Sequence, residues 1–318
     1  MTAVDVDDQN FRCWLPRIAE SIEGAAFVSF DLEFLGLPSA LKNHSASLFD
    51  SPSDRYRKVR DAVRRFPPCQ LGLVCFQEDG DAARYRPDVY CITLFKRVPQ
   101  REFSVSPSAV CFLSKHDFDF NKFAFHGVNY CTKTEAAKLR SEVSFGEFDF
   151  RQLREDFADL VRSVRIQIAA ESEGDVGVSQ LLDGPFQLKG PVEVELFRSQ
   201  DNAEGDTVPR CLSPLEEAAL HYVLQEEFPD LEFRTDPSRT LLCVENRQPV
   251  LDNDSILPTQ QKLEMLIAEI SGVSRIFDLL SAQKVPIVAH NCLLDLMYIY
   301  NYFDDDLPGT STVQSTED

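Results

Sequence analysis

The sequence has little of what membrane and secreted proteins need. No stretch approaches the roughly 18 uninterrupted apolar residues that indicate a membrane-spanning helix. The first ten residues, MTAVDVDDQN, carry acids where a secretion signal carries basic residues followed by an apolar run. The nine cysteines form no C-x-x-C pair, which indicates reduced thiols rather than a disulfide framework or a zinc cage. These absences favour a protein of the nucleus or the cytoplasm, with no membrane segment in this chain.

Positive charge is also scarce. The chain has 32 Lys and Arg against 52 Asp and Glu, a net charge of −20. This balance argues against a protein that coats nucleic acid through a basic surface. It suits either plain solubility or a metal site built of carboxylates. The clearest basic stretch, RYRKVRDAVRR (55–65), predicts a surface that follows a phosphate backbone or, equally, a solvated helix face.

The hydrophobic pattern predicts an α/β chain with a sizeable core. Alternating or continuous apolar residues predict strands at 26–34, 69–77 and 88–96, and a buried strand at 285–290. Helical spacing predicts helices between and after them, and 257–283 reads as one long helix or two. Linker-like composition in the middle marks a change of domain. The predicted division is a first domain part at 1–170, an inserted small α+β unit at 171–256, a continuation of the first part at 257–308 and a disordered tail at 309–318.

The first candidate for chemistry is the pair Asp31 and Glu33 at the end of the apolar run FVSF. Strand alternation puts both carboxylates on one face. A charge at the end of a buried strand is costly unless a metal ion or a charged partner compensates for it. Mg²⁺ favours oxygen ligands such as carboxylates. The alternative is an acid pair that faces solvent.

The second candidate is the segment His290-Asn291-Cys292-Leu293-Leu294-Asp295, where a predicted strand passes into a helix. Asn291 is a suitable N-cap, and Asp295 falls in or just past the first turn. Asp295 is therefore a candidate metal ligand. The alternative is that Asn291 only caps the helix and Asp295 only offsets its dipole.

Taken together, these segments resemble the poly(A)-specific ribonuclease and pre-piRNA trimmer branch of the CAF1-type DEDD exonucleases. The resemblance rests on FVSFDLEFLGL, SLFDSPSDRYRKVRDAVRRF leading to CQLGLVCF, FLSKHDFDFNKFAFHGVNY, and GVSRIFDLL with VPIVAHNCLLDLMYIYNYF, in the order of the family. These motifs cover about residues 15–130 and 265–308.

The resemblance implies a ribonuclease H-like mixed sheet flanked by helices and a Mg²⁺-dependent 3′→5′ exoribonuclease that uses two metal ions. Its substrate would be a single-stranded RNA 3′ end, either poly(A) or a small RNA. Asp31, Glu33 and Asp295 would be catalytic and bind metal. Phe34 and Leu37 would pack against the terminal bases, or else belong to the core, and Asn291 would contact the terminal nucleotide. A homodimer is also implied.

The chain departs from the family pattern in two places. The fourth aspartate and the general-base histidine of the family lie downstream of the second candidate segment, where the sequence stops, so we expect this chain to be a truncated or degraded form with weak activity. The alternative is an inactive RNA-binding or dimerising pseudo-nuclease. In the inserted unit, the family's Arg-x-x-x-His becomes Glu217 and His221, so we expect that unit to be structural and to bind RNA poorly.

Overall fold

The computed structural model describes residues 3–41, 47–80, 84–171, 187–196, 211–247 and 258–309. The chain divides into two compact units, one made of residues 1–137 and 271–318 and the other of residues 138–270. The boundaries predicted from composition stay a prediction. The predicted disordered tail lies outside the described residues, apart from Gly309.

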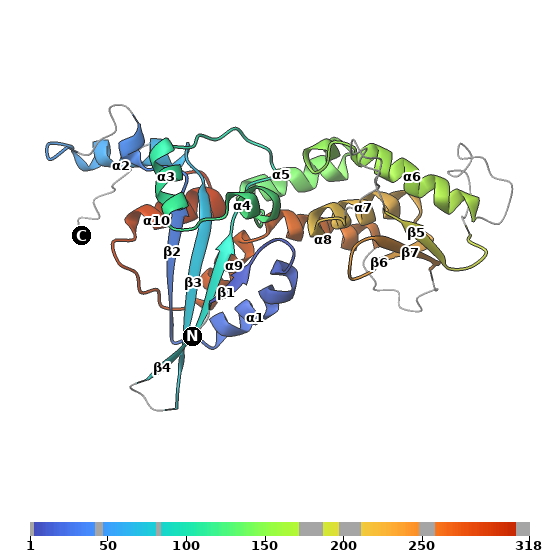
Figure 1. The fold of residues 1–318 in the computed structure, drawn as a ribbon, viewed down its shortest axis with the longest axis horizontal. Helices are drawn as coiled ribbons and strands as arrows, with labels where there is room; N and C mark the ends of the chain where they lie inside the picture. The colour runs from blue at the N-terminus through green and yellow to red at the C-terminus, as the bar shows by residue number, and fades with distance from the viewer. Residues whose placement is uncertain are drawn as a thin grey trace, which may run out of the picture. The chain divides into compact units, whose positions relative to one another are not determined.

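The first unit is built on a four-stranded mixed sheet in the order β1-β4-β3-β2 (Figure 1). β2 (Phe27–Phe34), β3 (Pro68–Glu78) and β4 (Tyr85–Thr93) form an antiparallel meander, and β1 (Val4–Val6) adds in parallel to β4. The three predicted strands are confirmed. β1 was not predicted, because three residues are too few to show an alternating pattern.

Residues 286–288 extend this sheet beyond β2. Val28 and Ile287 form a parallel bridge, in which Val28 N donates to Pro286 O (2.9 Å) and Val288 N donates to Val28 O (2.8 Å). A meander whose first strand gains a parallel neighbour is the predicted ribonuclease H-like arrangement. The prediction of a buried strand at 285–290 is wrong, since Ile287 and Val288 are 48% and 56% exposed. Within the described residues, the backbone hydrogen bonds of this segment run to Val28 of β2, and its side chains stay half exposed.

Helices cover this sheet and close its ends. Those of the first unit are α1 (Phe11–Glu23), α2 (Pro52–Val63), α3 (Pro107–Lys115), α4 (Phe120–His126), α9 (Ser274–Gln283) and α10 (Leu293–Ile299), with a 3-10 turn at Pro38–Ala40 and a π-helical turn at Tyr300–Asp304. α5 (Lys133–Ser144) begins in this unit and ends in the other. No described helix has the length and apolar character to cross a bilayer.

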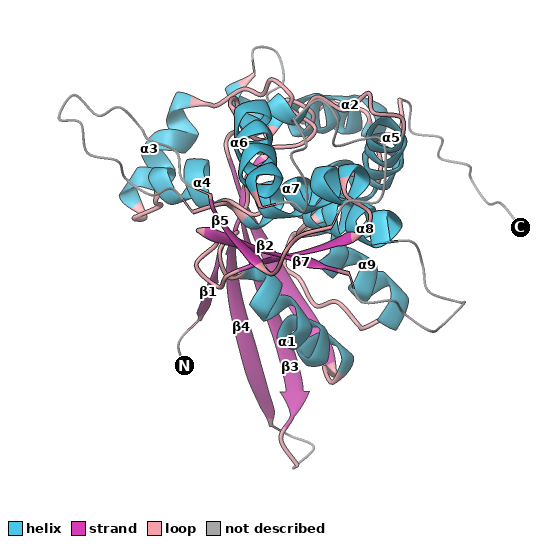
Figure 2. Cartoon of the chain, turned by 90° about the vertical axis from the view of Figure 1, so that its right-hand side faces the viewer, coloured by secondary structure: helices cyan, strands magenta, loops and turns pink. Residues whose placement is uncertain are grey.

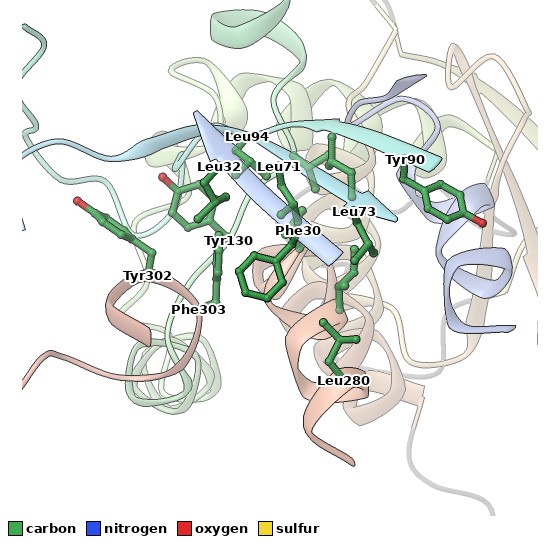
Figure 3. Close-up of a cluster of buried hydrophobic side chains, with 14 of the residues drawn as sticks. Phe30, Leu32, Leu71, Leu73, Tyr90, Leu94, Tyr130, Leu280, Tyr302 and Phe303 are labelled. Atoms are coloured by element: carbon green, nitrogen blue, oxygen red, sulfur yellow. The ribbon is translucent and has the colours of Figure 1, made fainter. Parts of the chain in front are cut away.

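The main core of the first unit lies on one face of the sheet. α1 lies against β3 there, as Figure 2 shows with strands in magenta, and it also packs against α9. Alternate strand residues point into this layer, where they meet aromatic rings from the end of the chain (Figure 3). The labelled members are Phe30, Leu32, Leu71, Leu73, Tyr90, Leu94, Tyr130, Leu280, Tyr302 and Phe303.

The second unit is a small α+β structure, as predicted for an insertion. Its elements are α6 (Phe157–Ala170), α7 (Pro214–Glu227), α8 (Pro258–Ser271), a 3-10 turn at Phe150–Gln152 and the antiparallel strands β5 (Val192–Glu195), β7 (Leu241–Asn246) and β6 (Leu231–Thr235) in that spatial order. α7 starts with a capping box, in which Ser213 accepts from the N–H of Glu216 and Glu216 accepts from that of Ser213.

Candidate active site

β2 presents its two acidic residues on the face opposite the core. Val28, Phe30 and Leu32 are buried at 0%, 6% and 4% exposure, whereas Asp31 is exposed and Glu33 is half-buried. The side chains of Asp31 and Glu33 therefore project from the same side of the strand, as the alternation predicted.

Asp295 lies in the first turn of α10 and reaches the free edge of β2. Its Oδ1 accepts a hydrogen bond from the backbone N–H of Leu32 at 3.2 Å, across 263 positions of sequence. Figure 1 shows α10 beside β2. Because Leu32 stands between Asp31 and Glu33, this bond brings the third predicted carboxylate to the same end of the strand.

The carboxylates affect one another electrostatically. Burial raises the pKa of Glu33, and the charges of Asp31 and Asp295 raise it further, while His116 partly offsets them. Burial also raises the pKa of Asp295, against two backbone hydrogen bonds that lower it, and Asp31 adds to the rise. The effects of burial and of like charge are those that a bound cation would reverse.

The three side chains are of the right chemical type to bind a metal ion, but they do not lie close enough together to share one. Three carboxylates supply the oxygen ligands that a hard divalent cation takes. Among the described residues, however, no group of three or more His, Cys, Asp or Glu side chains lies close enough together to hold a metal ion.

The three predicted substrate-binding residues differ in their surroundings. A register shift after Glu33 turns Phe34 so that its ring stacks on Tyr298 of α10, with centroids 4.0 Å apart. Phe34 therefore packs against the core, whereas Leu37 is 45% exposed. Asn291 is exposed but is not the N-cap: Cys292 holds that position, and Asn291 takes a left-handed φ of 51°, which asparagine tolerates better than most residues.

A hollow of about 230 Å³ adjoins Glu33 on the side of β3 and β4. Glu33, Gln70 and Thr93 form one row across the three strands, and His116 and Lys122 close the hollow from α3 and α4. No role was predicted for His116, because its place beside Glu33 depends on the packing of α3. The cross-strand register of Glu33 was the only signal that could have found this row.

The basic helix α2 is largely engaged within the protein. Tyr56 and Arg60 donate to the carbonyl of Pro308 at 3.0 and 3.2 Å, Arg60 also donates to that of Gly309, and Arg64 donates to that of Leu307 at 2.7 Å. Nearby, Lys58 pairs with Asp50. These contacts favour the reading of α2 as a structural helix over that of a phosphate track.

Two other predicted features lie apart from the carboxylates. Asp304 and Asp305, at the far end of the late helical segment, bind Lys133 and Thr134. In the second unit, Glu217 faces Arg239 at 3.9 Å and is 8% exposed.

The other half of that motif, His221, is 6% exposed and bonds Thr235 at 2.7 Å. A buried Glu-x-x-x-His pair with partners of its own offers little to a phosphate, which agrees with a structural role for the unit.

Comparison with known proteins gives consistent matches. A family model described as CAF1 family ribonuclease matches residues 6–314. The 3′-5′ exoribonuclease parn-1 of Caenorhabditis elegans is 30% identical over 311 residues, which cover 96% of this chain and 52% of the relative. Poly(A)-specific ribonuclease PNLDC1 of Mus musculus is 28% identical over 312 residues (96% and 54%), and the pre-piRNA 3′-exonuclease trimmer of Bombyx mori is 28% identical over 316 residues (98% and 54%). The chain spans about half the length of these relatives.

Proposed function

The chain belongs to the CAF1 family of ribonucleases, and from that premise we propose that it carries the metal-binding edge of a 3′→5′ exoribonuclease. The observation that supports this proposal most is the hydrogen bond from Leu32 to Asp295, which joins the late helix to the strand that bears Asp31 and Glu33. Acidic residues of two distant segments come to the same end of the strand there, although the burial of charge is costly.

The substrate is a single-stranded RNA 3′ end. The relatives are named for poly(A) and for pre-piRNA, and both substrates end in a free 3′ nucleotide. All nine cysteines are free, which suits the reducing conditions of the nucleus or the cytoplasm. A homodimer, as the family resemblance implies, is part of the proposal.

Each residue of the site has a role in this reaction. Asp31, Glu33 and Asp295 would hold divalent cations, Mg²⁺ in the cell, through their carboxylate oxygens. Bound cations would activate the attacking water and stabilise the leaving 3′ oxygen. The exposed Leu37 and the amide of Asn291 would contact the terminal nucleotide.

Phe34 would act in part through its stack on Tyr298, which fixes the position of the ring next to Glu33. The hollow that adjoins Glu33 has room for one nucleotide base, with the row of Glu33, Gln70 and Thr93 as its floor.

A second function, RNA binding without hydrolysis, is favoured by one observation. The carboxylates as they stand do not form a group that holds a metal ion. Raised pKa values of Glu33 and Asp295 also weaken their hold on a cation, because protons compete for the same oxygens. In this alternative, the chain binds 3′ ends and leaves them intact.

The experiment that separates the two functions is a Mg²⁺ titration of the purified 318-residue chain with 5′-labelled oligo(A). We expect slow trimming that rises with Mg²⁺ and falls more than about 100-fold in Asp31→Asn. The matched control is Asp306→Asn, which removes an exposed acid from the end of the same late segment and should leave trimming unchanged.

Thermal unfolding provides a readout besides activity. At ten times its dissociation constant, a cation that binds only the folded protein stabilises it by about 1.4 kcal/mol. Asp31→Asn should lose this stabilisation and Asp306→Asn should keep it. No Mg²⁺-dependent shift and no trimming, with oligo(A) still bound, would support the alternative function.

A further inference from the structure

A larger hollow, of about 550 Å³, opens on the other side of the sheet, between α1 and the outer ends of β3 and β4. Asp88 and Tyr90 of β4 pair in register with core-facing residues of β3, so they point away from the face that bears Asp31 and Glu33. Figure 3 shows Tyr90 at the margin of the core with its hydroxyl turned away from the other labelled side chains. The hollow is therefore separate from the candidate active site.

One wall of this hollow combines an aromatic ring with a cation. Trp14, the single tryptophan of the chain, lies edge-on to Tyr90 with ring centroids 6.5 Å apart. The guanidinium of Arg17 lies over its ring at 6.0 Å. A half-buried indole with a guanidinium over its ring offers a planar heterocycle both an aromatic and a cationic contact.

Two arginines line the hollow in a chain that is otherwise strongly acidic. Arg17 reaches it from α1 and Arg86 from β4. Within the described ranges, neither guanidinium forms an ion pair with a carboxylate. Arginine binds phosphate through paired, charge-assisted hydrogen bonds, so this arrangement favours an anionic phosphate.

The floor of the hollow is polar and ordered. The hydroxyl of Ser21, which is 8% exposed, lies 3.0 Å from Asp88 Oδ2 and 2.7 Å from the Tyr90 hydroxyl. Gln77 donates to the carbonyl of Ser21 at 2.8 Å and fixes this side of α1. Asp88 keeps acceptor capacity beyond Ser21, which suits ribose hydroxyls or an exocyclic amino group.

We infer that this hollow binds a nucleoside 5′-monophosphate unit, with its base on Trp14 and its phosphate between Arg17 and Arg86. The volume lies within the roughly 300–1,000 Å³ of small-ligand pockets. Glu20 and Asp88 also line the hollow, and their negative charges oppose a polyphosphate more than a single phosphate. The unit is either a free mononucleotide or one nucleotide of an RNA strand, and both present the same chemistry.

The fluorescence of Trp14 reports directly on this site, because the chain has no other tryptophan. The probe is adenosine 5′-monophosphate, titrated into the purified 318-residue chain in EDTA. We expect a saturable change in emission, with adenosine and inorganic phosphate each at least about 10-fold weaker, as the loss of a charge-assisted contact implies. An oligo(A) octamer in EDTA forms a second arm.

Variants separate the hollow from the rest of the surface. Arg86→Gln should weaken binding at least about 10-fold. Arg84 belongs to the same hairpin but lies outside the hollow. Arg84→Gln removes the same charge, so the affinity of this variant for adenosine 5′-monophosphate should stay within about twofold of that of the unchanged chain. Asp31→Asn should leave binding unchanged, which keeps this test independent of the exonuclease proposal. Circular dichroism checks that each variant is folded.

The outcomes are distinct. If the octamer displaces the mononucleotide and needs Arg86, the site takes a nucleotide of an RNA strand. If only the mononucleotide binds, the site takes a free nucleotide, and either result supports the inference. The inference is overturned if neither ligand changes the emission of Trp14, if adenosine binds as well as its monophosphate, or if Arg84→Gln weakens binding as much as Arg86→Gln does.

Discussion

The substitution Gly272→Ala should destabilise the first unit strongly. Gly272 separates α8 from α9 and has a φ of +44°. A Cβ there would lie 1.9 Å from the carbonyl oxygen of Asn129 and 2.8 Å from its carbonyl carbon. Both atoms belong to the backbone, so a side-chain rotation cannot relieve the clash.

Three contributions add up to the expected loss. The left-handed conformation costs a residue with a Cβ about 1 to 2 kcal/mol. Displacement of Asn129 weakens the hydrogen bond that its carbonyl accepts from Val273 N at 3.0 Å, which adds about 1 kcal/mol. Overpacking adds about 1 to 3 kcal/mol. We therefore expect the free energy of unfolding to fall by about 3 to 6 kcal/mol.

Urea unfolding followed by the emission of Trp14 measures this loss, because that tryptophan lies in the first unit. The control is Gly80→Ala. Gly80 also has a positive φ, +59°, but an added Cβ there would meet no described atom within 4 Å. It should therefore lose only the roughly 1 to 2 kcal/mol of conformational strain. Equal losses for the two variants would refute the argument that the clash dominates.

Three further predictions concern buried polar groups and the carboxylates. The backbone N–H groups of Arg97 and Val98 donate to the side-chain oxygen of Asn129 at 2.7 and 3.0 Å, and Asn129→Ala removes this acceptor. Urea unfolding should show that the free energy of unfolding falls by about 2 to 4 kcal/mol, and a fall below about 1 kcal/mol would contradict this. Ser213→Ala removes one side of a capping box and should cost about 1 kcal/mol in the second unit, measured by circular dichroism at 222 nm, whereas a neutral result would show that the cap is dispensable. Folding raises the pKa of Glu33 and Asp295, so the stability that their protonated forms contribute is present below their unfolded pKa values and is lost as the pH rises through the folded values. Asp31→Asn removes a negative charge that raises the pKa of both groups in the folded protein. In EDTA, the urea midpoint of this variant should therefore fall less between pH 4 and pH 7 than that of the unchanged chain. Identical dependence of the two midpoints on pH would count against the interaction of Asp31 with Glu33 and Asp295.

Local patterns predicted the strands and one face of the site. The apolar residues of β2 alternate with Asp31 and Glu33, and the structure buries the former and leaves the latter outside the core. Asp295 was placed in the first turn of its helix for a similar local reason. Such features depend on neighbours within a few residues, which is the range that periodicity reports.

Features that depend on tertiary packing were missed or wrong. The apolar run at 285–290 reads as buried, but apolar character alone does not say how many sides of a segment are covered. Asparagine is a common N-cap residue, yet the N-cap of α10 is the residue after Asn291, namely Cys292. His116 lies beside Glu33 because Leu113 of α3 packs in a cluster with Cys69 of β3, and no local pattern carries that information.

The hydrogen bond between Leu32 and Asp295 can form only late in synthesis, because its two residues lie far apart in the sequence. The strand leaves the ribosome 263 residues before its partner, and at about 5 to 20 residues per second this interval is about 13 to 50 s. Throughout it, the outer edge of β2 has no chain to pair with, and an unpaired edge invites pairing with another nascent copy. Asp31 and Glu33 place two like charges at that edge, which oppose such pairing. The residues proposed for catalysis would thus also limit aggregation of the unfinished sheet until the late helix has formed.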